Sequence, residues 1–65
     1  MTYTQFLQLE NKDRSSIVIC EGLLMEKRET DSYQISLYQL FNFCVELRLH
    51  KPSDTIVSCN PIVFN

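Results

Sequence analysis

The clearest structural signal in this chain is the octapeptide FCVELRLH at residues 43–50. Its odd-numbered residues, from Phe43 to Leu49, are apolar and alternate one by one with its even-numbered residues. Because successive side chains of a β-strand point to opposite faces of a sheet, the octapeptide is predicted to be a strand with one apolar face. Residues 51–54 after it are predicted to form a turn, since their proline fixes φ and cannot donate a ladder hydrogen bond.

The same period of two extends the predicted sheet in both directions along the chain. Residues 23–28 and 33–38 also alternate, and Thr30-Asp31-Ser32 between them has turn-forming residue types. A last strand is predicted from Thr55 towards Val63, and its Pro61, which is tolerated only at an edge or a bulge, favours an edge strand. The second half of the chain is therefore predicted to be a four-stranded antiparallel β-meander. The residues expected to supply much of its core are Ile17, Leu24, Ile35, Leu37, Val45, Leu47, Leu49 and Ile56.

Two short helices are predicted before the sheet. Thr2 or Thr4 can serve as the N-cap of the first helix, in which apolar residues recur at three- and four-residue spacing. The next segment, residues 11–21, is ambiguous. Ile17-Val18-Ile19 favours a strand, whereas residues of capping type at both ends of the segment are typical of a helix. Propensity alone favours the strand.

One pattern covers nearly the whole chain. It consists of Gly22-Leu23-Leu24 with Arg28, Leu37-Tyr38-Gln39-Leu40, Phe43-Cys44-Val45-Glu46 and His50. This pattern resembles a group of small bacterial proteins of the Bacteroides type, which have an LYQL…F-x-VE strand pair. The resemblance implies a helix before the glycine, so a second helix is predicted at about residues 11–21, and the fold class is α+β with the helices packed on the meander. It implies no activity.

The link between the two central strands, Phe41-Asn42, decides which side chains share a face of the sheet. The similar proteins carry Asp-Gly here, and phenylalanine tolerates positive φ poorly. With a two-residue turn, both faces are partly apolar and need cover, which favours a dimer. With a three-residue turn, one face is cleanly apolar and the other carries the candidate interaction residues Tyr38, Glu46, Arg48 and His50. Both registers remain open from the sequence.

The length and net charge of the chain limit the number of domains and the kinds of partner that it is expected to have. The chain has 65 residues, which fit one domain spanning residues 1–65. Its 6 basic residues are scattered and its formal net charge is -2, so nucleic-acid binding is not predicted. The N-terminus lacks a secretory pattern, and the longest apolar run, residues 17–20, is far below the roughly 20 residues that span a bilayer. We expect a cytoplasmic protein without a membrane segment.

The three cysteines, Cys20, Cys44 and Cys59, lack the close paired spacing of metal motifs. They are interpreted as reduced thiols that fill small apolar spaces, and neither a metal nor a cofactor is predicted. Cys44, His50 and Asp54 have the residue types of a nucleophile, a base and an orienting group, but nothing in the sequence indicates that they converge. No catalytic residue is therefore assigned.

Two classes of function follow from these observations. The first is a small interaction or regulatory module that acts through its sheet surface at Tyr38, Glu46, Arg48 and His50, with a homodimer as the expected assembly and an unidentified protein as a further partner. The alternative is a small ligand-binding protein or enzyme that uses the Cys44/His50 region. A pocket that joins Cys44 and His50 would favour the alternative, whereas a continuous sheet face would favour the module.

Overall fold

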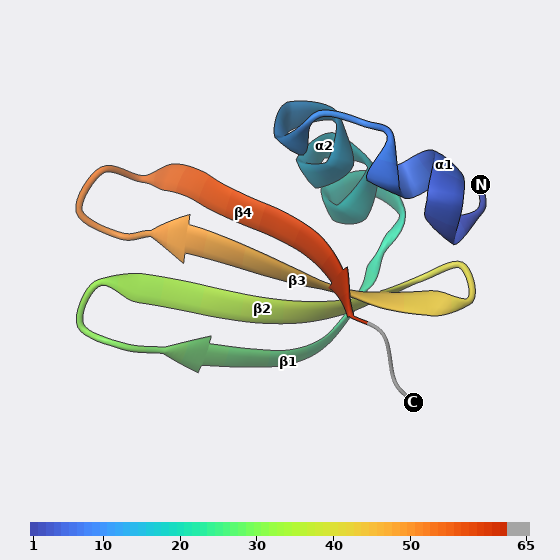
Figure 1. Cartoon of the computed structure of the whole chain (residues 1–65). Coiled ribbons are helices and arrows are strands. Elements are labelled where there is room, and N and C mark those ends of the chain that lie inside the picture. The colour runs from blue at the N-terminus through green and yellow to red at the C-terminus, as the bar shows by residue number, and fades with distance from the viewer. Residues whose placement is uncertain (63–65) are drawn as a thin grey trace.

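The computed structural model describes residues 1–62 and contains two short helices and one four-stranded sheet (Figure 1). The elements are α1 (Tyr3–Leu7), α2 (Asn11–Glu21), β1 (Leu23–Glu29), β2 (Tyr33–Leu40), β3 (Phe43–His50) and β4 (Thr55–Ile62). The antiparallel strands lie side by side in chain order, so the predicted α+β class and the β-meander are confirmed. β4 lies at an edge, as Pro61 indicated, and the predicted strand end at Val63 lies outside the described residues.

α1 begins at a reciprocal pair of hydrogen bonds between Thr2 and Gln5. The Thr2 hydroxyl accepts from the Gln5 backbone N–H at 3.1 Å, and Gln5 Oε1 accepts from the Thr2 N–H at 2.9 Å. This capping box satisfies two backbone donors that a helix N-terminus leaves without intrahelical partners. Of the two candidate N-caps, Thr2 is the one that is used.

Residues 11–21 form a helix although Ile17-Val18-Ile19 favours a strand. The buried residues of α2 are Ser15 and Val18, which lie three residues apart and therefore on one face of the helix. The Ser15 hydroxyl donates to the Asn11 carbonyl at 2.7 Å, so this buried polar group has a partner within the helix. Burial of one helical face outweighs the β-propensity of the segment.

Gly22 ends α2 in an extended conformation rather than in the left-handed one of many C-cap glycines. Its φ is -77° and its ψ is 154°, and its N–H donates to the Val18 carbonyl at 2.8 Å. A Cβ at this position would lie 2.5 Å from that carbonyl oxygen and 3.1 Å from the Tyr38 ring. The glycine is needed because its Cα lies against the last turn of α2 and, more loosely, against Tyr38 of β2, and not for backbone freedom.

The turn between β2 and β3 has two residues, Phe41 and Asn42, because Leu40 pairs with Phe43. Phe41 has a φ of 57°, a left-handed conformation that costs energy for an aromatic residue. Of the two registers that the sequence left open, the two-residue one is therefore formed. Tyr38 consequently lies opposite Val45 and shares its face of the sheet.

The buried core combines both helices with one face of the sheet, which we call the helix-side face. Its members are Phe6, Val18, Leu40, Val45, Leu47 and Cys59. The core prediction is confirmed for Val45 and Leu47, and Ile17 and Ile56 pack against the cluster while remaining partly exposed. Phe6, Val18 and Leu40 were not among the predicted core residues, whereas the burial of Cys59 agrees with its interpretation as a thiol that fills apolar space.

The other predicted core residues, Leu24, Ile35, Leu37 and Leu49, lie outside this cluster, and Leu49 is half-buried on the helix-side face. Leu24 is 48% exposed because β1 is an edge strand, so its prediction was wrong. Ile35 and Leu37 are half-buried on the face opposite Val45, which follows from the two-residue turn. A bulge between Leu24 and Glu26 also breaks the alternation predicted for β1, so that Leu23 and Glu26 point to the same face.

Arg14 of α2 connects both helices to β4. Its Nε donates to the Phe6 carbonyl at 3.2 Å, and Nη2 donates to the Leu7 carbonyl at 2.6 Å. Its Nη1 donates to the Cys59 carbonyl and to Asn60 Oδ1, both at 3.2 Å. The guanidinium carbon also lies 5.9 Å from the centroid of the Phe6 ring. One side chain therefore satisfies carbonyls at the end of α1 and on the edge strand β4.

Gly22→Ala should lower the free energy of unfolding by about 1–3 kcal/mol, because the added methyl group overlaps the Val18 carbonyl and meets Tyr38. Urea denaturation of both proteins measures the loss. Glu21→Ala is the matched control, since Glu21 is exposed and its truncation should change stability by less than about 0.5 kcal/mol. Equal stability of Gly22→Ala and the wild type would contradict the lack of space for a side chain between the Val18 carbonyl and Tyr38.

Arg14→Lys should destabilise the protein by about 2 kcal/mol although it keeps the charge, because one ammonium group cannot reach two carbonyls of α1 and one of β4 at once. Thermal and urea denaturation provide the measurement. Lys12→Ala on the exposed side of α2 is the control. A loss below about 0.5 kcal/mol would show that the planar fork of the guanidinium is not required.

Candidate functional site

The candidate site is the sheet face opposite the helix-side face, which we call the open face. Pairing across the strands places on it Leu23, Glu26 and Arg28 of β1, Tyr33, Ile35, Leu37 and Gln39 of β2, Cys44, Glu46, Arg48 and His50 of β3, and Thr55, Ser58, Asn60 and Ile62 of β4. Both helices lie near β4 and away from β1 (Figure 1). Within residues 1–62, the helices contribute their buried side chains to the other face of the sheet.

An apolar strip runs along the middle of the open face. Ile35 and Leu37 of β2 are half-buried, and together with Ile62 they line a shallow hollow of about 210 Å³. Charged side chains border this hollow, among them Glu26 on β1 and Glu46 on β3. The face therefore has an apolar centre and a charged border.

Tyr33 and Arg48 form the polar end of this strip. The Arg48 guanidinium carbon lies 6.0 Å from the centroid of the Tyr33 ring, and Arg48 Nη2 donates to Glu46 Oε1 at 3.1 Å. The His50 ring centroid is 5.3 Å from that of Tyr33. Arg48 Nε is buried and has no hydrogen-bond partner among the described residues. Tyr33 thus contacts two side chains of the neighbouring strand on the open face.

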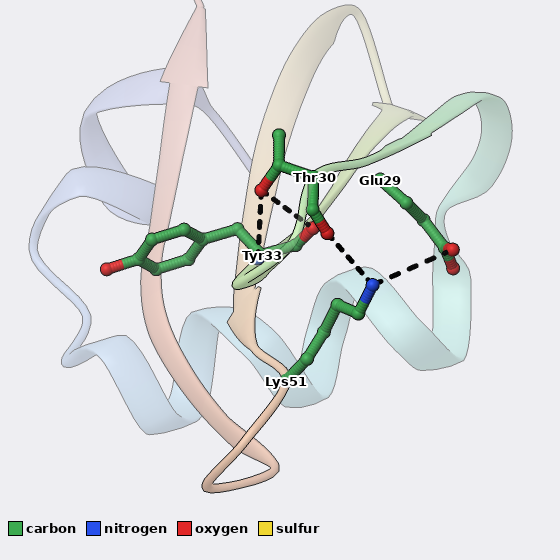
Figure 2. A network of polar contacts seen from close by, with 4 residues as sticks. All are labelled: Glu29, Thr30, Tyr33 and Lys51. Carbon is green, nitrogen blue, oxygen red and sulfur yellow. Dashed lines mark hydrogen bonds and ion pairs between the residues drawn. The ribbon is translucent and has the colours of Figure 1, made fainter.

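Lys51 fixes the backbone beside Tyr33 (Figure 2). Its Nζ donates to the Thr30 carbonyl at 2.9 Å and lies 3.9 Å from Glu29 Oε2. The Thr30 hydroxyl in turn accepts from the Tyr33 backbone N–H at 3.0 Å, and the Lys51 N–H donates to the Ser32 carbonyl at 2.8 Å. These contacts join the turn after β3 to the turn after β1, and so they hold the start of β2 in place.

The structure brings together three of the four predicted interaction residues. Glu46, Arg48 and His50 follow one another on the open face of β3, whereas Tyr38 lies on the helix-side face beside Gly22. Sequence reasoning placed Tyr38 with the other three only for a three-residue turn. The two-residue turn instead places Tyr33, Ile35 and Leu37 on the same face as Glu46, Arg48 and His50. The sequence signal for this register was that only two residues separate Leu40 from Phe43.

Cys44 and His50 do not meet in one pocket. They lie six residues apart on β3, which corresponds to about 20 Å along a strand. His50 Nδ1 instead shares a hydrogen bond of 2.8 Å with the Ser53 hydroxyl, and Asp54 lies further along the same turn. The residues considered for nucleophilic chemistry are therefore not arranged as a nucleophile and its base.

The three cysteines occupy different environments, and all are free thiols. Cys59 is fully buried, Cys44 is half-buried and Cys20 is exposed, so the prediction of a small apolar filler is wrong for Cys20. Burial raises the pKa of the Cys59 thiol, while a hydrogen bond with Ser15 and the positive charge of Arg14 act in the opposite direction. Within residues 1–62, no group of three or more His, Cys, Asp or Glu side chains is placed to hold a metal ion.

Comparisons with protein families, with curated proteins and with solved structures found no match. The resemblance to small bacterial proteins thus stays an expectation from the sequence. As to membranes, no helix in the described part of the chain has the length and apolar character needed to span one.

The raised pKa of Cys59 predicts a loss of stability in alkali. The folded state favours the neutral thiol, so this contribution is complete below the unfolded pKa of about 8.5 and is lost as pH rises through the higher folded pKa. Urea denaturation at pH 7 and pH 10 should show a larger decline for the wild type than for Cys59→Ala, which cannot ionise at this position. Equal declines in the two proteins would contradict the role of Cys59.

Proposed function

We propose that this protein is a small interaction module that binds another protein through the open face of its sheet. The observation that carries the proposal is the apolar strip of Ile35 and Leu37 on a face to which neither helix contributes its buried residues. Antiparallel sheets commonly have one solvated face, but that face is then mainly polar. A strip of apolar side chains with a charged border is typical of an interaction surface.

The residue types around the strip support binding to a protein. Tyrosine and arginine are enriched among the residues that dominate binding energy, and Tyr33 and Arg48 lie against each other here. The Lys51 contacts hold the start of β2, so Tyr33 is positioned before a partner arrives. Such preorganisation lowers the entropic cost of association.

The charges on the open face also favour a protein partner over a nucleic acid. Arg48 is paired with Glu46, and Arg28 is paired with Glu26 at 3.0 Å, so both arginines on the open face have an acidic neighbour. A phosphate backbone is bound by a surplus of positive charge, which these pairs do not provide. A protein surface with charges of both signs matches this arrangement better.

Site-specific photocrosslinking in the native host tests the proposal. A photoreactive amino acid in place of Leu37, at the centre of the strip, should give covalent adducts with a specific protein that mass spectrometry identifies. Arg48→Glu in the same chain should reduce these adducts by about tenfold, because it places a second acidic group beside Glu46 and removes the contact with Tyr33.

The matched control carries the same photoreactive group at Lys12, which is exposed on α2. Circular dichroism of each variant verifies that the fold is retained. Adducts from position 37 that do not exceed those from position 12 would contradict binding through the open face.

A further inference from the structure

The two edges of the sheet differ in whether they can accept another strand. On β4, the Cys59 carbonyl accepts a hydrogen bond from Arg14, and Pro61 has no backbone N–H to donate. In the described part of the chain, β1 has neither a proline nor a side-chain hydrogen bond to its backbone from outside, its bulge is confined to its first half between Leu24 and Glu26, and all of its residues are exposed. Leu23, Leu24 and Met25 are exposed by 66%, 48% and 54%. An unprotected edge strand is a template for pairing with another chain.

The charges on β1 match those of a second β1 strand that runs in the opposite direction. Glu26 and Arg28 lie on the open face and form an ion pair of 3.0 Å within the strand. When Lys27 is placed opposite Lys27 of a second copy, Glu26 of each copy faces Arg28 of the other. The acidic Glu29 then lies diagonal to Lys27 of the second copy on the helix-side face.

We propose that the chain forms a homodimer by antiparallel pairing of β1 with β1 of a second copy, about a twofold axis at Lys27. The inference goes beyond the proposed function, because its partner is a second copy of this chain and it uses the edge of the sheet rather than the open face. The two sheets become one continuous sheet, and the two open faces join into one surface. A closed twofold arrangement is also the commonest assembly of soluble proteins.

This register is favoured over its neighbours by charge. A shift by two residues in one direction places Glu26 opposite Glu26, and a shift in the other direction places Arg28 opposite Arg28. In the proposed register, two Glu26–Arg28 pairs on the open face oppose the single repulsion between the lysines, and each such pair contributes a fraction of a kcal/mol. Seven residues of β1 form a small interface compared with the roughly 1,200–2,000 Å² of stable complexes, so the dimer is weak and depends on concentration.

Sedimentation equilibrium over a range up to about 1 mM tests the proposal on the full chain. The weight-average mass should rise from 7.7 kDa towards twice that value. Glu26→Arg should weaken the dimer by about tenfold, because Arg then faces Arg28 at two places. The double variant Glu26→Arg/Arg28→Glu should restore dimerisation, since it exchanges the charges and keeps their complementarity.

Asp13→Arg is the matched control, because it makes the same change of net charge at an exposed position on α2. Circular dichroism verifies the fold of each variant. A wild type that stays monomeric at about 1 mM would overturn the proposal, and it would show that the charges of β1 block the edge instead. Loss of the dimer in Asp13→Arg as in Glu26→Arg would overturn it too.

Disulfide trapping tests the register directly. Opposed residues of antiparallel strands have Cα atoms about 4.5–5.5 Å apart, which suits a disulfide. In a Cys20→Ser background, which removes the exposed native thiol, Lys27→Cys should form a covalent dimer on mild oxidation. Val57→Cys, exposed on the protected edge strand β4, should remain monomeric. Equal trapping at both positions would overturn the proposed pairing.

These outcomes are separable from those of the proposed function. Photocrosslinking at Leu37 probes the open face, whereas Glu26→Arg acts on the edge. Adducts at Leu37 that persist in a monomeric Glu26→Arg variant, with a protein other than this chain, leave the interaction function intact. A reversible dimer that is restored by the double variant, without such adducts at Leu37, supports the edge pairing and contradicts binding of another protein through the open face.

Discussion

The rest of the structure depends on the hydrogen bonds that the Arg14 guanidinium donates to backbone carbonyls of α1 and β4. A chain of 65 residues buries only about 60% of its unfolded surface, so few contacts are available to hold two short helices against a sheet. α1 has five residues, too few to be stable alone, and its last carbonyls lack intrahelical partners. Arg14 donates to the Phe6 and Leu7 carbonyls at this end and to the Cys59 carbonyl of β4 with one planar group, which fixes α1 and α2 beside the same strand.

The same contact makes the sheet asymmetric. Because Arg14 and Pro61 occupy the outer side of β4, the helices lie next to that edge and leave β1 without cover (Figure 1). The buried cluster accordingly draws on β2, β3 and β4 but includes no residue of β1. The position of the helices beside β4 thus explains both why the β4 edge is covered and why the β1 edge is exposed. The proposed interactions use the parts of the sheet that the helices do not cover.

Residue patterns predicted the strands well because alternation is a local property. Residue propensities could not predict the helix at residues 11–21, because Ile17-Val18-Ile19 favours a strand. The burial of Ser15 and Val18 against the sheet favours the helix. The bulge in β1 likewise follows from pairing with β2 and leaves no local signal. For the site, Glu46, Arg48 and His50 were grouped correctly by their spacing on one strand. Which of Tyr33 and Tyr38 lies on the open face depends on the length of the turn between β2 and β3. Phe41 and Asn42 do not favour the two-residue turn that is formed.

That turn shows which effect determines the interaction surface. The left-handed conformation of Phe41 costs about 1–2 kcal/mol, and a third turn residue would relieve it. A longer turn, however, would move Leu40 to the opposite face, out of the cluster that also contains Val45, and burial of one such side chain contributes about 1.5–3 kcal/mol. It would also take Tyr38 away from Gly22. The two-residue turn keeps Leu40 in the core and Tyr38 beside Gly22 in spite of this strain, and as a consequence Ile35 and Leu37 are placed on the open face. Ile35 and Leu37 are thus on the open face because Leu40 of the same strand is buried on the helix-side face and side chains alternate along β2.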